Sequence, residues 1–236
     1  MKINVDPSKA EVAKRFSGYL EEHIKNNSSF HIALSGGSTP KEIFDYMAVH
    51  ATDTDWSKVH LYWGDERCVP PTDSESNYKM TVDHLLSKID IPEENIHRIL
   101  GEDSPESEAI RYGKVLEARL PQVNGVPQFD LVILGMGDDG HTASIFPHQI
   151  GLWDSEANCE VAIHPDSGQR RITITGKIIN RAKTVAFLVT GKSKAEKVKC
   201  IIDKEEGHGI YPASLVAPIS GNLIWFLDTE AAANII

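Results

Sequence analysis

The segment GMGDDGHTASIFP, residues 135–147, places a histidine and two aspartates among glycines. An imidazole moves protons readily near neutral pH, and a nearby carboxylate can orient it or stabilise its charge. His141 is therefore a candidate general acid–base residue, with Asp139 as one acid that could assist it. A lone histidine is more often structural, and that is the alternative. Residue 145 is Ile, so the His-x-x-x-His zinc pattern is absent, and the acidic spacing of an EF-hand is missing too.

The segment SGGSTP, residues 35–40, could bind an anion. It lies between a predicted strand and a predicted helix, so backbone amides and a helix N-terminus can face one phosphate. Gly36 and Gly37 permit close approach of the backbone, and Ser38 and Thr39 add hydroxyl donors. The spacing and the lysine of a Walker loop are absent. The alternative is a strand-to-helix turn capped by Ser38 or Thr39.

Further charged residues follow other predicted strands. In WGDERC, Arg67 offers a planar fork of donors to a phosphate or carboxylate, and Asp65 could contact substrate hydroxyls or support proton transfer. Arg171 opens a short strand. Lys194 lies in the first turn of a predicted helix, where a cation does not complement the helix dipole. A shared anion would account for these cations; solvated side chains and a turn that pairs its own charges are the alternative.

The elements that position these residues alternate along the chain. Val12, Phe16, Leu20 and Ile24 are four apart, which predicts an amphipathic helix over about 7–26. Similar patterns predict helices at 40–50, 74–88, 105–120 (with Ser104 as its N-cap) and 192–203. Short apolar runs predict strands at 30–34, 58–66, 95–100, 129–135, 171–175, 184–191 and 222–228.

This alternation, without a linker or an internal repeat, predicts that residues 1–236 form a single α/β domain. A mainly parallel sheet would be covered by helices on both faces, as a three-layer α/β/α sandwich. Ligands of such sheets bind beyond the carboxyl ends of the strands. The polar segments after Leu34, Trp63 and Leu134 should therefore meet at one edge of the sheet.

The amino-acid composition limits the classes of partner that we expect the protein to bind. The chain is 41% hydrophobic and 25% charged, with a formal net charge of -10 and no basic block, which disfavours nucleic acid and anionic membranes. Because this net charge also repels a phosphate group, a phosphate site would need cations and N–H donors gathered at one place. Three widely spaced cysteines argue against a disulfide framework and structural zinc. Without a signal-peptide pattern or a run of about 20 apolar residues, we expect a cytoplasmic protein. No exposed apolar stripe stands out, which favours a monomer.

In this order, SGGSTP, DERCVPPTDSESNY, GMGDDGHTASIFP, RRITIT and TGKSKA resemble the 6-phosphogluconolactonases, which share a superfamily with the glucosamine-6-phosphate deaminases. The resemblance covers about residues 10–227. It implies a Rossmann-like α/β/α fold and hydrolysis of 6-phospho-D-glucono-1,5-lactone to 6-phosphogluconate in the oxidative branch of the pentose phosphate pathway. A lactone carbonyl is already electrophilic, so we expect neither a metal nor a cofactor.

The implied mechanism gives each candidate a role. His141 would take a proton from the water that attacks C1 and then protonate the departing ring oxygen. Asp139 could orient the ring, and Asp65 would contact substrate hydroxyls or support catalysis; which acid assists His141 stays open. The C6 phosphate would lie on residues 36–39. By resemblance, the cations that complete the phosphate site are Arg67, Arg171 and Lys194.

Three other functions are considered. The related deaminases usually carry a glutamate five residues after the histidine, where this chain has Phe146, which cannot share a proton. A non-catalytic sugar-phosphate sensor of a transcription regulator would give His141 no catalytic role. Such a protein would normally carry a DNA-binding segment, and we expect no room for one before the first helix. A serine hydrolase needs a G-x-S-x-G elbow, and Ser144 follows the histidine too closely to be that nucleophile. The lactonase is favoured.

Overall fold

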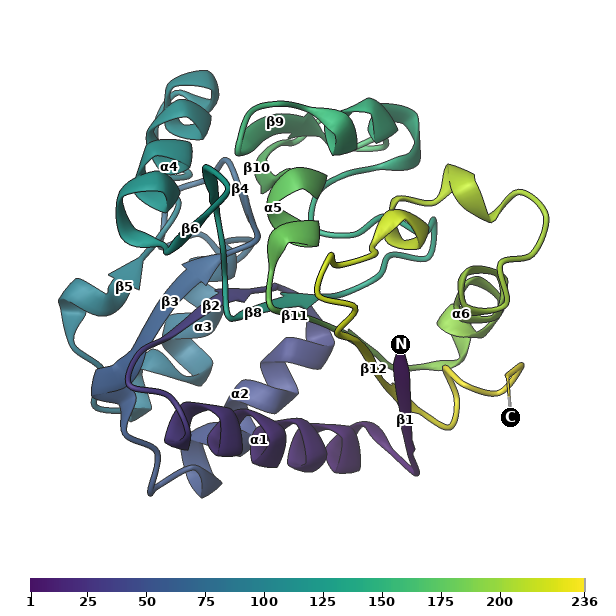
Figure 1. The fold of residues 1–236 in the computed structure, drawn as a ribbon, viewed down its shortest axis with the longest axis horizontal. Coiled ribbons are helices and arrows are strands. Elements are labelled where there is room, and N and C mark those ends of the chain that lie inside the picture. Colours follow the sequence, from purple (N-terminus) through teal and green to yellow (C-terminus); the bar gives the residue numbers. More distant parts are fainter. Residues whose placement is uncertain (236) are drawn as a thin grey trace.

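The structure is a computed structural model that describes residues 1–235. A seven-stranded sheet forms its centre, in the order β1-β12-β11-β8-β2-β3-β5, with each neighbouring pair parallel (Figure 1). Its strands are β1 (Lys2–Asp6), β2 (Phe30–Leu34), β3 (Val59–Trp63), β5 (Ile96–His97), β8 (Leu131–Leu134), β11 (Thr184–Val189) and β12 (Leu223–Asp228). The predicted α/β class with a mainly parallel sheet is confirmed.

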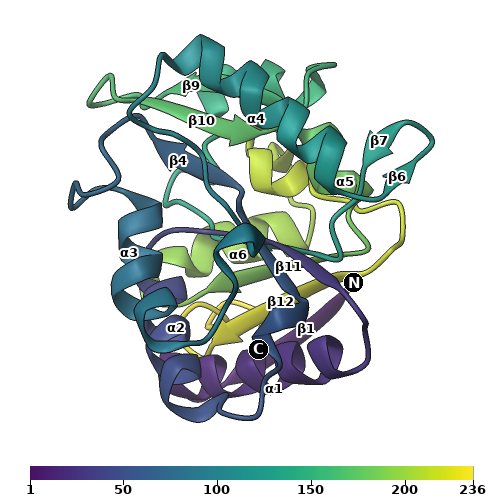
Figure 2. The ribbon, with the colours of Figure 1, turned by 90° about the vertical axis from the view of Figure 1, so that its left-hand side faces the viewer.

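Helices lie on both sides of this sheet. They are α1 (Lys9–Lys25), α2 (Ser38–His50), α3 (Asn77–His84), α4 (Pro105–Arg119), α5 (Gly176–Arg181) and α6 (Ala195–Ile202). Helices α1, α2 and α3 share one side, whereas α4 and α5 lie on the other (Figures 1 and 2). This arrangement is the predicted three-layer sandwich. It leaves the carboxyl ends of the strands free to carry loops.

Helix α1 packs against the sheet through its apolar face. Val12, Phe16, Leu20 and Ile24 are all buried, as their four-residue spacing predicts. The Phe16 ring stands edge-on against Phe226 of β12, with ring centroids 5.3 Å apart. Burial of a side chain of this size contributes about 1.5–3 kcal/mol. These contacts hold α1 against the sheet.

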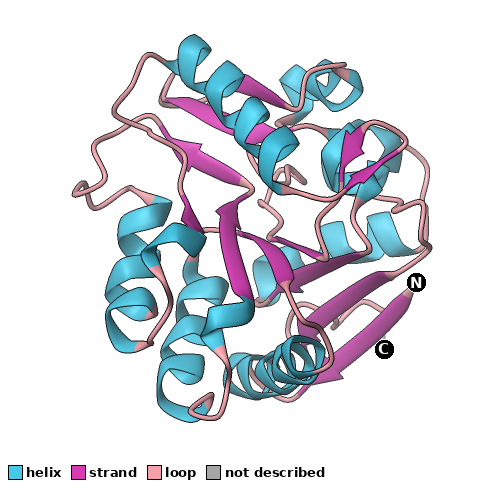
Figure 3. Ribbon diagram, turned by 60° about the vertical axis from the view of Figure 1, so that its left-hand side comes forward, coloured by secondary structure: helices cyan, strands magenta, loops and turns pink. Residues whose placement is uncertain are grey.

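A second, antiparallel sheet lies on the α4 side of the central sheet (Figure 3). It contains β4 (Asp65–Arg67), β10 (Arg170–Ile174) and β9 (Cys159–Ile163), and a separate hairpin joins β6 (Gln122–Val123) to β7 (Val126–Pro127). The strand predicted at 171–175 therefore does not belong to the parallel sheet, because an apolar run does not specify its partner. The antiparallel register places Arg171 opposite Arg67.

Several elements had no signal in the sequence. Strand β1 is a short strand at the edge of the sheet, and only Asp6 in it is buried, so its sequence has no apolar run. The first element of the chain is therefore this strand and not the helix that follows it. Strand β9 and helix α5 are short and were also missed. Ser104 stands at the N-cap of α4 as predicted, but its side chain makes no capping hydrogen bond.

Candidate active site

A cavity of about 220 Å³ lies where the segments after β2, β3 and β8 come together. The predicted convergence at the carboxyl ends of the strands is therefore what the structure shows. All of the sequence-predicted site residues except Asp139 line this cavity: Gly36, Gly37, Ser38, Thr39, Asp65, Arg67, His141, Arg171 and Lys194. Asp139 lies behind His141 and contacts it directly.

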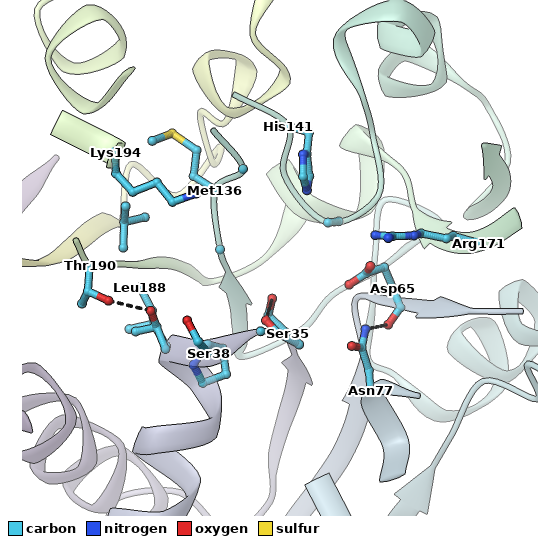
Figure 4. A pocket seen from close by; sticks show the side chains of 18 of the residues that line it. Ser35, Ser38, Asp65, Asn77, Met136, His141, Arg171, Leu188, Thr190 and Lys194 are labelled. Atoms are coloured by element: carbon cyan, nitrogen blue, oxygen red, sulfur yellow. Dashed lines mark hydrogen bonds between the residues drawn. The ribbon is translucent and has the colours of Figure 1, made fainter. Parts of the chain in front are cut away.

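The His141 ring points into the cavity (Figure 4). Its Nδ1 atom lies 2.6 Å from Asp139 Oδ1, which also accepts the His141 backbone N–H at 3.1 Å. An ionised carboxylate only accepts, so Nδ1 carries the proton and the Nε2 lone pair is free. Among the described residues Nε2 has no hydrogen-bond partner. The ring is thus oriented to accept a proton from a molecule in the cavity.

The contacts of Asp139 keep its carboxyl group ionised. Burial alone would raise the pKa of this carboxyl, but hydrogen bonds from the His141 ring and amide, together with the charge of the ring, lower the pKa to about 2. Asp139 therefore stays ionised at neutral pH. A fixed carboxylate beside Nδ1 stabilises the imidazolium that forms when Nε2 takes up a proton.

The glycines after β8 make room for the ring. A Cβ on Gly137 would lie 2.2 Å from His141 Nδ1 and 2.6 Å from Asp139 Oδ1, far inside contact distance. Thr142, the next residue after the histidine, donates its hydroxyl to Gly135 O at 2.8 Å. The sequence GMGDDGHT therefore folds so that the histidine lies directly over its own glycine turn.

The N-terminus of α2 carries no side-chain cap. Gly37 is its N-cap residue with φ of +106°, a value that L side chains rarely adopt, and Ser38 is already helical. The alternative, a turn capped by Ser38 or Thr39, is not what the structure shows: Thr39 Oγ1 instead meets Thr190 Oγ1 at 2.8 Å. The first N–H groups of a helix have no intrahelical partner. They remain available to an anion in the cavity.

Positive side chains enter the cavity from two sides. Arg171 lies beside Asp65, whereas Lys194 lies across the cavity, beyond His141 (Figure 4). Burial lowers the pKa of the Arg171 guanidinium, and Asp65 opposes this effect. Lys194 lies at the N-cap of α6 rather than in its first turn, and its Nζ is 2.6 Å from Asp138. Three cations therefore line this cavity in a chain whose net charge is -10, and one of them, Lys194, is paired with a carboxylate.

Arg67 is fixed by the loop that follows it. Its guanidinium donates to Glu75 O, and its buried Nε has no partner in the described part of the chain. The neighbouring Glu66 faces away from the cavity and accepts the backbone N–H groups of Arg67, Asn77 and Tyr78. Burial raises the pKa of Glu66, although these N–H groups oppose the shift. Glu66 thus joins β4 to the start of α3.

The sequence analysis gave no role to several residues that line the cavity, among them the polar residues Ser35, Asn77 and Thr190. Asn77 is buried and donates from Nδ2 to Asp65 O at 2.9 Å, and Thr190 follows β11. Asn77 lies within the stretch DSESNY, but its type and spacing alone carry no chemical signal. Its role depends on α3 beginning at residue 77, after the N-cap Ser76.

Two further observations concern metal ions and membranes. Within 1–235, no group of three or more His, Cys, Asp or Glu side chains is placed to hold a metal ion. No helix in the same range is long and apolar enough to cross a membrane. What the cavity contains is one oriented base, one buried carboxylate and several cations near a free helix N-terminus.

Comparisons with known proteins identify the family of this chain. The family described as glucosamine-6-phosphate isomerases/6-phosphogluconolactonase matches residues 5–225. A 6-phosphogluconolactonase of Haemophilus influenzae is 47% identical over 207 residues, 87% of each chain, and one of Treponema pallidum is 44% identical over 202 residues, 85% of this chain and 84% of its own. The structure of 6-phosphogluconolactonase from Trypanosoma brucei is 30% identical with a TM-score of 0.89, over 100% of this chain and 98% of that one. The chain belongs to the glucosamine-6-phosphate isomerase/6-phosphogluconolactonase family.

Proposed function

We propose that this protein hydrolyses 6-phospho-D-glucono-1,5-lactone to 6-phospho-D-gluconate, in the oxidative branch of the pentose phosphate pathway. The observation that carries the proposal is the His141–Asp139 pair over a cavity with cations on two sides. The two bacterial relatives at 44% and 47% identity are 6-phosphogluconolactonases, which supports the proposal.

In the proposed mechanism, His141 Nε2 takes a proton from the water that attacks C1 of the lactone. The tetrahedral intermediate then breaks its bond to the ring oxygen, and the imidazolium returns its proton to that oxygen. Asp139 stabilises the imidazolium between these steps, through the 2.6 Å contact with Nδ1. The carboxylic acid formed ionises and releases one proton to solvent, so both atoms and charge balance.

The phosphate group is bound, in this proposal, by residues 36–39 together with Arg67, Arg171 and Lys194. The uncapped N-terminus of α2 supplies N–H donors, and the cations flank the cavity. A hydrogen bond to a charged group contributes about 1.5–3 kcal/mol. Two or three such bonds outweigh a long-range repulsion that salt screens over about 8–10 Å. Asp65 would accept from substrate hydroxyls.

The deaminase chemistry of the same family is less favoured. Phe146 occupies the position where a proton-sharing side chain would be needed, and its ring centroid is 4.7 Å from that of His141. The Phe146 side chain is wholly buried and carries no group that can exchange a proton with His141. The Arg171 guanidinium lies 5.6 Å from the centroid of the Phe146 ring.

Several further properties belong to the same proposal. We expect one domain that acts as a monomer in the cytoplasm on a free phosphosugar lactone, without nucleic acid, membrane or cofactor. The large apolar side chains that are exposed in the described chain are Met1, Ile3, Val49, Ile110, Ile163, Ile210 and Ile219. Light scattering after gel filtration tests the monomer, and a stable dimer peak contradicts it.

The direct test is proton release after fresh 6-phosphoglucono-1,5-lactone is added to purified, chelator-treated protein. Rates are corrected for spontaneous hydrolysis. Glucosamine 6-phosphate is assayed in parallel for ammonia. We expect rapid acid production that the chelator does not change, and no ammonia. Ammonia release would favour the deaminase activity. No proton release above the spontaneous rate and no ammonia would contradict both activities.

A further inference from the structure

The Ser144 hydroxyl lies behind the wall of the cavity and donates to Asp65 Oδ2 at 2.6 Å. Ser144 is wholly buried and Asp65 nearly so, at 5% exposed. A buried carboxylate needs hydrogen-bond partners to offset the loss of solvent. Among the side chains of residues 1–235, Ser144 is the one that meets this carboxylate within hydrogen-bond distance.

The backbone holds Ser144 in this position. Residues 142–145 form a tight turn, closed by the Ile145 N–H donating to Thr142 O at 3.0 Å. Ala143, inside the turn, has φ of +48°, the left-handed region that a non-glycine residue adopts at a cost of about 1–2 kcal/mol. The Ser144 N–H then donates to Thr173 Oγ1 of β10 at 3.2 Å. The strain at Ala143 is maintained by bonds on both sides.

This turn begins directly after His141, so it joins two parts of the cavity that are far apart in the sequence. His141 belongs to the segment after β8, whereas Asp65 begins β4. One oxygen of Asp65 is held by Ser144. The other, Oδ1, accepts no hydrogen bond within the described chain, and the carboxylate points toward the cavity (Figure 4). Only one oxygen is left for a substrate.

We propose that Ser144 is a positioning residue, which holds Asp65 by one oxygen so that the other faces the substrate beside His141. The inference rests on the proposed lactonase function. Ser144 does not act as a nucleophile, because its hydroxyl is inaccessible and is hydrogen-bonded to a carboxylate rather than to a histidine. Its effect on the reaction passes through Asp65.

The test is a double-mutant cycle of Ser144→Ala and Asp65→Asn, with kcat and KM for the lactone and the inhibition constant of inorganic phosphate. Loss of a hydrogen bond to a charged group predicts that Ser144→Ala lowers kcat about 10- to 100-fold. The phosphate inhibition constant should change less than about 3-fold, because Asp65 is not assigned to the phosphate. In the Asp65→Asn background, Ser144→Ala should lower kcat no further.

Two further variants sharpen the test. Ser17→Ala is the matched control, because Ser17 is equally buried in α1 and its Oγ has no partner among the described residues; its kcat should equal that of the wild type. Ser144→Cys keeps a side chain in the space of the serine but donates a weaker hydrogen bond to Asp65. It replaces Ser144→Ala in the cycle if that variant does not fold. Its kcat loss should likewise disappear in the Asp65→Asn background.

The outcomes separate the two claims. Wild-type kcat in Ser144→Ala or Ser144→Cys, or an Asp65→Asn enzyme with wild-type kcat, would overturn the positioning role. Losses that multiply fully in the double variant would overturn it too. No lactonase activity in either the wild type or Ser17→Ala would overturn the proposed function together with this inference.

Discussion

Replacing Asp139 by Asn tests the charge behind His141. The change removes a carboxylate whose Oδ1 accepts both the ring Nδ1, at 2.6 Å, and the backbone N–H of His141, at 3.1 Å. The amide oxygen of an asparagine can take the place of Oδ1 and accept both N–H groups, but it carries no negative charge. The imidazolium that forms when Nε2 takes up a proton therefore loses the carboxylate that stabilises it.

The size of the loss follows from the exposure of the pair. In a buried triad the same exchange lowers kcat about 10⁴-fold. Here the Asp139 side chain is 41% exposed, so water replaces part of its effect. We therefore expect kcat to fall about 10²-fold, which corresponds to about 2.7 kcal/mol in the activation free energy.

The assay is proton release from the lactone at several pH values, with spontaneous hydrolysis subtracted. Because the pKa of Asp139 is about 2, acidification to pH 5 leaves the carboxylate charged, and only the substitution removes it. The inhibition constant of inorganic phosphate serves as the control and should change little. A kcat within about 3-fold of the wild type would refute the assignment of Asp139.

Three other predictions concern the same fold. Gly137→Ala should lower kcat at least about 10-fold with little change in KM, because a Cβ there would lie 2.2 Å from His141 Nδ1; wild-type kcat would contradict this placement. Lys194→Ala should raise the inhibition constant of inorganic phosphate about 10-fold with kcat nearly unchanged, and equal phosphate inhibition would remove Lys194 from the phosphate site. Burial lowers the pKa of His31 and His97 from 6.5 to about 4 in the folded chain. The unfolded chain therefore takes up their protons first, and the free energy of unfolding should fall as pH drops from 6.5 to 4, by about 1–2 kcal/mol for each ring after solvent screening. Urea titrations of His31→Gln and His97→Gln measure this slope, and a slope identical to that of the wild type would contradict the role of the rings.

The parts of this fold with a strong local signal could be predicted from sequence. The stripe of Val12, Phe16, Leu20 and Ile24 has one helical period and one buried face, so α1 was predictable. Strand β1 was not, because its formation depends on pairing with β12, more than 200 residues later in the chain. The partner of β10 was also unpredictable, since an apolar run does not encode whether its neighbour is β4 or the central sheet.

The same contrast holds in the cavity. His141 and the loop at 36–39 could be proposed from residue type and glycine spacing alone. Asn77 and Ser144 could not, because each is linked to the cavity by a hydrogen bond to residue 65 that only the fold creates. The uncapped helix N-terminus at Gly37 was likewise hidden, since the sequence offered Ser38 and Thr39 as ordinary caps.

The most direct test of the account is lactone turnover by His141→Ala, measured beside the wild type with the phosphate inhibition constant of both. The account predicts that kcat falls by about 10²–10⁴, the usual contribution of general acid–base catalysis, while phosphate inhibition stays within about 3-fold. Wild-type turnover by His141→Ala would contradict the central claim that this ring transfers the proton.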